Sequence, residues 1–187
     1  MSISGFQATP RHNVFVSYHH ANDEAYKNNF VDYFANQTKQ IISRAVEIGD
    51  IDSGLPTETI RTRIRDNFIR DATVTVVLIG TETWKRRHVD WEIASSLRQT
   101  SKNSRCGLIG LILPTHSNYL STSYTAGLIP PRLVDNQKCG FAKIYKWTTD
   151  GASVVNWIHE AYNRRLSVEP DNSRVGFKYN RTGDSWS

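Results

Sequence analysis

The chain has 187 residues, of which 39% are hydrophobic and 22% charged, and this size and composition suit one globular domain with a substantial core. No apolar run approaches the ~18 residues of a membrane helix, and the N-terminal stretch MSISGFQATPRHN lacks an apolar signal core, so neither membrane insertion nor secretion is expected. The only cysteines, Cys106 and Cys139, form no CxxC pair. A structural zinc site is therefore not expected, and a reduced, cytoplasmic setting fits.

The net charge of +5 could attract nucleic acid or another phosphate-bearing ligand. The basic residues are spread over the stretches RTRIRDNFIR, KRR and NRR, without the interleaved aromatic residues of a nucleic-acid platform. Ordinary solvated helix faces explain them, so a nucleic-acid partner is not expected.

Hydrophobic periodicity predicts strands and helices that alternate along the chain. The predicted strands are 13–20, 43–48, 72–80, 105–114 and 141–147, and the predicted helices are 23–41, 57–71, about 87–99 and 150–166. The stretch 72–80, ATVTVVLIG, is typical of a central strand that is buried on both faces. In the helix from about 87 to 99, Val89, Ile93 and Leu97 share one face, and Trp91 and Glu92 fall outside it.

This alternation favours an open parallel sheet with helices on both faces, because each parallel pair of strands needs a crossover connection. We expect an N-terminal arm at 1–12, one domain at 13–166 and an irregular C-terminal tail at 167–187. The polar segment 115–137 is long for a connection, and we interpret it as a lid that excludes water.

Ligands on open parallel sheets bind outside the carboxyl ends of the strands. Three polar stretches, SYHH, GDIDSGLP and GTETWKRRHVDWE, should meet at this edge. They contain the candidate site residues Ser17, Tyr18, His19, Asp50, Asp52, Trp84, His88, Trp91 and Glu92. The chain has no GxGxxG after a strand, no P-loop and no GxSxG elbow, which argues against the dinucleotide, nucleoside-triphosphate and hydrolase sites that depend on them.

A lone carboxylate such as Glu92 suits cleavage of a glycosidic bond, because it can stabilise an oxocarbenium-like transition state. No general acid is needed when the leaving group is already cationic, as nicotinamide is in NAD. Trp84, Trp91 and Tyr18 could stack on flat rings. The alternative interpretation is that Glu92 is a solvated residue in the first turn of a helix.

The other candidates also have alternative interpretations. His88 and Glu92 are four residues apart, so they could form a catalytic couple, half of a metal site or a surface ion pair. The sequence places no third ligand, so no metal is expected. His19 could bind a ligand or cap a loop, and Asp50 and Asp52 could meet ribose hydroxyls or form Asx turns.

At these residues the sequence resembles the TIR-like family that includes the Thoeris antiphage sensor proteins. The matching stretches are NVFVSYHH, TVTVVLIGTETWKRRHVDWEI and LIPPRLVDNQKCGFAKIYKW, in an order and spacing that cover most of residues 12–160. The resemblance implies a flavodoxin-like three-layer sandwich with five parallel strands and helices on both faces.

The resemblance also implies an activity: cleavage of the nicotinamide–ribose bond of NAD. NAD would be a substrate, with no further cofactor. A phage-derived trigger would activate the enzyme, and an ADP-ribose-derived product, often cyclic, would switch on a partner effector. Glu92 falls on the catalytic glutamate of the family, Trp91 on the aromatic residue before it, and Tyr18 and His19 on the pocket. GDIDSGLP takes the position of a loop that gates the site and supports self-association.

One position departs from the pattern of the family. Many catalytic relatives carry Trp where this chain has His88, and Trp84 lies one turn earlier. A non-catalytic scaffold that mediates protein assembly is therefore the main alternative. A nucleoside 2-deoxyribosyltransferase on a related fold is a further one.

Overall fold

The computed structural model describes residues 11–36, 41–44, 59 and 62–186. Its strands and α-helices are β1 His12–Ser17, α1 His20–Phe30, β2 Ile41–Arg44, β3 Val74–Ile79, α3 Arg87–Ser96, β4 Gly107–Ile112, α4 Pro131–Lys138, β5 Ala142–Lys146 and α5 Gly151–Ser167. Short helical turns lie at η1 Val31–Asn36, η3 Ile64–Phe68, η4 Thr83–Lys85 and η5 Ala126–Leu128.

The sheet has five strands in the order β2-β1-β3-β4-β5, and every neighbouring pair is parallel. This is the flavodoxin-like order, in which the direction of winding reverses between β1 and β3. The edge strand β2 pairs with β1 through its backbone. The side chains that the structure describes in the sheet belong to β1, β3, β4 and β5. The predicted parallel α/β architecture is confirmed.

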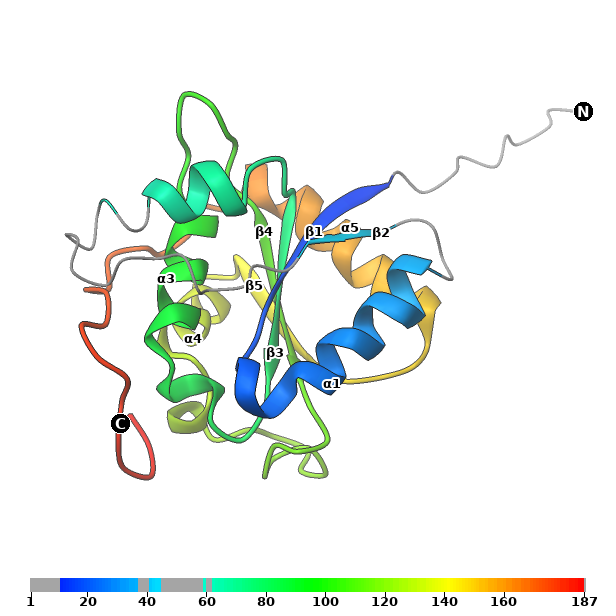
Figure 1. Cartoon of the computed structure of the whole chain (residues 1–187), viewed down its shortest axis with the longest axis vertical. Helices are drawn as coiled ribbons and strands as arrows, with labels where there is room; N and C mark the ends of the chain where they lie inside the picture. Colours follow the sequence, from blue (N-terminus) through cyan, green and yellow to red (C-terminus); the bar gives the residue numbers. More distant parts are fainter. Residues whose placement is uncertain (1–10, 37–40, 45–58, 60–61, 187) are drawn as a thin grey trace, which may run out of the picture.

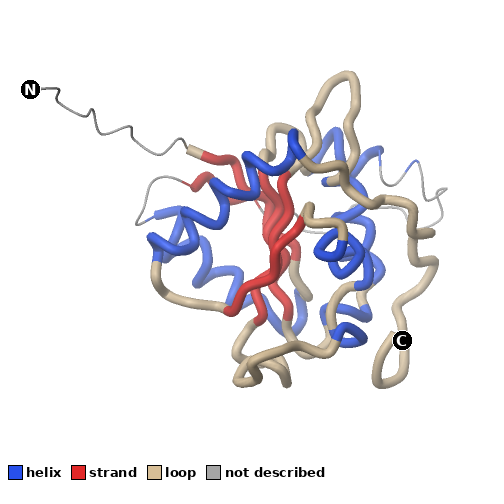
Figure 2. The backbone as a smooth tube through the Cα atoms, turned by 180° about the vertical axis from the view of Figure 1, so that it is seen from behind, coloured by secondary structure: helices blue, strands red, loops and turns tan. Residues whose placement is uncertain are grey.

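Helices cover both faces of the sheet, which gives three layers (Figures 1 and 2). One face packs against α1 and α5 through a core that includes Phe30, Phe34 and Ile158. The other face packs against α3 and α4 through Ile93 and Leu133. β3 is buried along its whole length, as its Val-rich sequence predicts for a central strand.

The close approach of α5 to the sheet depends on a glycine in β4. A Cβ atom at Gly107 would lie 2.3 Å from the carbonyl oxygen of Ala161 on α5. The side chain of Asp150 caps the same helix by accepting a hydrogen bond from the amide of Ala152. Asp150 therefore helps to fix where α5 begins, and Gly107 allows the helix to lie close to the sheet.

Three predicted elements differ from the structure. The helix predicted over 23–41 is α1 followed by the π-helical turn η1. Of the helix predicted over 57–71, the described helical residues are 59, 62 and 63 and the π-helical turn η3. The segment 115–137 is not a free lid, because it contains most of α4, the crossover helix between β4 and β5. Pro131 stands in the first turn of α4, where a missing amide costs nothing, and this proline was the overlooked signal.

The described residues after α5, 168–186, form no helix or strand, and they are bound closely to the rest of the domain. This C-terminal tail runs along the outer side of α3 and α4 (Figure 1). The indole of Trp91 donates to the carbonyl of Phe177, the side chain of Asn172 donates to the carbonyl of Ala94, and the indole of Trp186 donates to the carbonyl of Ile129. Within the described residues, no helix is both long and apolar enough to cross a bilayer.

Candidate functional site

A buried pair of side chains, Ser17 and Glu92, lies at the carboxyl end of β1. Ser17 is the last residue of this strand, and its side chain points to the α3 face because strand residues alternate between faces. Its Oγ donates a hydrogen bond of 2.5 Å to Oε2 of Glu92, and Glu92 is only 3% exposed. The interpretation of Glu92 as a solvated helix residue is therefore wrong.

The burial of Glu92 is a consequence of how α3 sits against the sheet. The predicted stripe of Val89, Ile93 and Leu97 is buried as expected. The helix is also enclosed on its other sides, and each residue from 89 to 96 is buried. The 3.6-residue pattern does not reveal this, because the second side is covered by the C-terminal tail and by residues near 64–72.

Burial controls the charge of Glu92. It raises the pKa of the carboxyl from 4.5 to about 8, and the hydrogen bond from Ser17 opposes this only in part. The carboxyl of the enclosed site is therefore mostly protonated at neutral pH. An anionic Glu92 requires a change around it, such as access to water or the arrival of a cation.

His88 lies one turn before Glu92 on α3, but the two side chains contact different partners. The Nε2 of His88 donates to the carbonyl oxygen of Tyr18 at 3.2 Å, and its ring packs edge-on against His20 at 5.5 Å between centroids. Burial, as the main cause, lowers the pKa of His88 to about 4. Both groups are thus mostly neutral near pH 7, and the interpretation of His88 and Glu92 as a surface ion pair is wrong.

Tyr18 and His19 connect β1 to α1, and the backbone of Tyr18 lies beside His88. The Tyr18 ring faces the α1 and α5 side of the sheet and stacks on His20, so its backbone carbonyl, rather than its ring, faces His88. The carbonyl of His19 accepts the first bonds of α1. Within the described part of the chain its buried Nδ1 has no partner, and burial lowers the pKa of the imidazole to about 4.

The two tryptophans are not exposed stacking platforms. Trp91 belongs to a core cluster with Phe15 and Ile69, and its indole nitrogen is bonded to the tail. Trp84 is 2% exposed, in the turn η4, with the ammonium of Lys85 at 5.3 Å from its ring. Both rings are enclosed by protein and are therefore not open to stack on a flat ligand in this state.

The sequence analysis missed a second carboxyl at this edge. Asp23 on α1 is 1% exposed, and its Oδ2 accepts a hydrogen bond from Thr83, whose Oγ1 also accepts from the amide of Gly80. A Cβ at Gly80 would lie 2.2 Å from the other oxygen, Oδ1. Burial raises the pKa of Asp23 to about 6, against bonds from Thr83 and the His19 backbone. The only sequence signal was an Asp early in a helix that follows a strand.

Asp50 and Asp52 lie outside the described residues, so their predicted contact with ribose stays a prediction. Among the described residues, no group of three or more His, Cys, Asp or Glu side chains is gathered as a metal ion would require. Cys106 is buried in the core, and burial raises the pKa of its thiol.

The arrangement brings together a buried carboxyl, a hydroxyl and a neutral imidazole where the winding of the sheet reverses. This is the position at which doubly wound sheets bind ligands. A carboxyl held there by one hydrogen bond can change its charge when a ligand changes its surroundings. Such a group can stabilise positive charge on a bound substrate, provided that the site opens to admit it.

Two solved structures are distantly similar to this chain. A solved structure of the TIR domains of the activated Roq1 resistosome, which recognises the pathogen effector XopQ, is 11% identical, with a TM-score of 0.38 over 83% of this chain and 84% of that one. General stress protein 14 from Treponema denticola in complex with FMN is 8% identical, with a TM-score of 0.40 over 84% and 97%. No curated protein matches the chain.

A family model supplies the assignment that these distant structures do not. The model described as "Thoeris protein ThsB, TIR-like domain" matches residues 15–118, which is more than half of the chain. The matched range includes Ser17, Asp23, His88 and Glu92. The chain therefore belongs to the Thoeris ThsB TIR-like family.

Proposed function

We propose that this protein is an antiphage-defence enzyme that cleaves the nicotinamide–ribose bond of NAD, with Glu92 as the catalytic residue. The observation that carries the proposal is a buried Glu92 carboxyl, bonded to Ser17, at the ligand-binding edge of a TIR-like fold. The ADP-ribose-derived product, in linear or cyclic form, would activate a partner effector.

The charge state of Glu92 gives the proposal a mechanism for control. In the enclosed site the carboxyl is mostly protonated at neutral pH, so it supplies little negative charge to a developing oxocarbenium ion. The nicotinamide ring of NAD is cationic, and a cation within a few ångströms favours the ionised carboxyl. Once the substrate has entered, its positive charge would therefore ionise Glu92.

A phage-derived trigger would act on the same step. An enclosed carboxyl needs a conformational opening before a dinucleotide can reach it, and such openings often limit turnover. Self-association of the domain is one route to that opening. The resting protein would then be silent, and the activated protein would hydrolyse or cyclise its substrate according to how well the closed site excludes water.

The decisive experiment replaces Glu92 with Gln, which keeps the shape and removes the charge. We expect nicotinamide release from NAD by activated protein to fall at least ~10²-fold, because one key electrostatic group is lost. Glu24→Gln is the matched control, since Glu24 is exposed on α1 and its change should leave the rate unaltered. Nicotinamide and the nucleotide product would be measured by liquid chromatography with mass spectrometry.

The same measurement separates an enzyme from a scaffold. A Glu92→Gln variant that releases nicotinamide as fast as the unmodified protein would remove Glu92 from the mechanism. Protection of cells against phage without any NAD turnover would instead support a non-catalytic scaffold. The structural argument for a scaffold is that Glu92 is almost completely enclosed and so does not face a substrate.

A further inference from the structure

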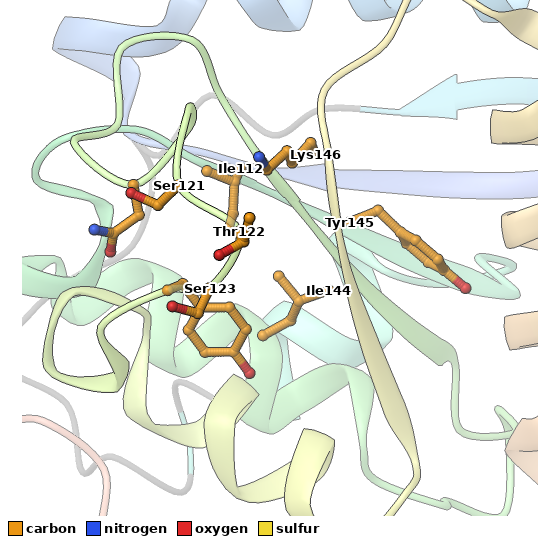
Figure 3. A pocket seen from close by; sticks show the side chains of 9 residues that line it. Ile112, Ser121, Thr122, Ser123, Ile144, Tyr145 and Lys146 are labelled. Atoms are coloured by element: carbon orange, nitrogen blue, oxygen red, sulfur yellow. The ribbon is translucent and has the colours of Figure 1, made fainter.

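A cavity opens at the same edge of the sheet as Glu92, but beside β4 and β5 rather than β1. Its volume is about 560 Å³, within the range of small-molecule sites in proteins. Figure 3 shows loop residues on one side of the cavity and strand residues on the other. It is lined by Ile112, Asn118, Ser121, Thr122, Ser123, Tyr124, Ile144, Tyr145 and Lys146.

The loop that forms one wall is held in place by its own hydrogen bonds. The side chain of Asn118 accepts from the amide of Thr125 at 2.8 Å, and the hydroxyl of Tyr119 donates to the carbonyl of Trp147 at 3.1 Å. The ring of His116 accepts from the amide of Asn118 and bonds the carbonyl of Leu128 through its other nitrogen. The cavity is thus largely formed before any ligand arrives, which lowers the entropic cost of binding.

The strand wall combines apolar surface with one positive charge. Ile144 and Lys146 are two residues apart on β5, so they face the same side of the sheet. Tyr145 points away from Ile144 (Figure 3). Its ring stacks on Trp157, with 4.1 Å between the ring centroids. Ile112, the last residue of β4, adds a second aliphatic side chain to the cavity.

The loop wall contributes hydroxyl groups and an aromatic ring. Ser121, Thr122 and Ser123 lie opposite the strand residues (Figure 3), and Tyr124 follows them in the lining. The described residues that line the cavity include a lysine and no carboxylate. Hydroxyl groups beside an ammonium group are suited to an anionic oxygen group, and aliphatic and aromatic side chains are suited to a flat ring.

We propose that this cavity binds a nucleotide, with the phosphate at Lys146 and the loop hydroxyls and the base against Ile112, Ile144 and Tyr124. The site is separate from Glu92, because Glu92 contacts the end of β1, and β3 lies between β1 and β4 in the sheet. It therefore does not depend on cleavage of NAD. A nucleotide bound there would contact the crossover that carries α4.

The test measures AMP binding to the full chain by isothermal titration calorimetry. Lys146→Glu should weaken AMP at least ~10-fold, because repulsion replaces a charge-assisted hydrogen bond. Thr122→Trp should also weaken AMP, since it fills the cavity from an exposed loop position without changing charge. Lys178→Glu makes the same charge change at an exposed tail position outside the lining and should leave AMP affinity unchanged.

Adenosine and inorganic phosphate, titrated separately, divide the recognition between ring and anion, and each should bind more weakly than AMP. Phosphate that binds as tightly as AMP would overturn the assignment to a nucleotide. The proposal also fails if AMP does not bind at ~1 mM, or if Lys146→Glu and Thr122→Trp both bind it normally. AMP binding that is lost in Glu92→Gln but kept in Lys146→Glu would place the ligand at Glu92 instead.

Discussion

At the scale of single residues, the central feature is a carboxyl whose charge is suppressed by its surroundings. Glu92 is enclosed on α3, and the Ser17 hydroxyl is the group bonded to its side chain. One hydrogen bond does not replace the hydration that an ionised carboxylate loses on burial. The protein therefore holds this group in the protonated form, and folding favours that form.

Replacing Glu92 with Gln should make the folded protein more stable at high pH. The pKa of Glu92 is raised from 4.5 to about 8, so between these values the folded state holds a proton that the unfolded state has released. Stability from this group is fully present below pH 4.5 and is lost as the pH rises towards 8. Gln does not titrate, so its advantage should grow with pH, to roughly 1–3 kcal/mol.

Urea unfolding of both proteins at pH 5 and pH 8 measures this advantage. The Glu24→Gln control, at an exposed position, should follow the unmodified protein at both pH values. An equal difference between Glu92→Gln and the unmodified protein at pH 5 and pH 8 would show that Glu92 does not carry a raised pKa.

At the scale of secondary-structure elements, α3, α4 and the tail are joined by one buried ion pair. Arg132 on α4 and Asp90 on α3 are 0% and 2% exposed, with Nε and Oδ1 2.9 Å apart. The tail completes the pair: the amide of Phe177 donates to Asp90, and the carbonyl of Arg174 accepts from Arg132. Asp90 is two residues from Glu92, so the network also fixes the helix that carries the candidate catalytic group.

Removing one member of this pair should destabilise the fold strongly. Arg132→Met leaves the carboxylate of Asp90 buried without its cation, and we expect the free energy of unfolding to fall by ~3–5 kcal/mol. Lys143→Met is the matched control, because the Lys143–Glu160 pair is 52% and 40% exposed and contributes at most ~1 kcal/mol. Similar midpoints of urea unfolding for the two variants would contradict a structural role for the buried pair.

At the scale of the whole molecule, buried titratable groups set the pH at which the fold is most stable. Burial, as the main cause, lowers the pKa of His12, His19 and His88 from 6.5 to about 4. Their contribution to stability is present above pH 6.5 and is lost as the pH falls towards 4. Asp23, raised from 3.8 to about 6, and Glu92 act in the opposite direction, because they lose stability as the pH rises.

These opposing groups predict a maximum of stability at about pH 6.5. Below this pH, acidification lowers the free energy of unfolding through the three imidazoles and raises it through the two carboxyls. The three imidazoles have the larger combined effect, so the stability falls. Above the maximum, Glu92 is the group of this set that still titrates, so stability falls more gently towards pH 8. Urea unfolding at half-unit steps from pH 4.5 to 8.5 tests this profile, and a maximum above pH 8 would contradict it.

The sequence by itself determined the parallel α/β class and the central position of β3, and it singled out Glu92 as a candidate site residue. Each of these inferences rests on a local feature, such as an alternating pattern or the Val-rich run 74–79. Local features can be read from the sequence because they depend only on neighbouring residues. The helix α4 was missed because only eight residues, Pro131–Lys138, form it, too few for a clear period.

Only the tertiary structure decided the state of the site. Whether Glu92 is solvated or enclosed depends on Ser17, 75 residues away in sequence, and on a tail bonded to Trp91 from 86 residues away. The raised pKa of Asp23 likewise depends on burial and on its position over Gly80. The burial of a group, and with it the pKa, depends on the segments that pack around the group. Their own sequence does not show where these segments will pack.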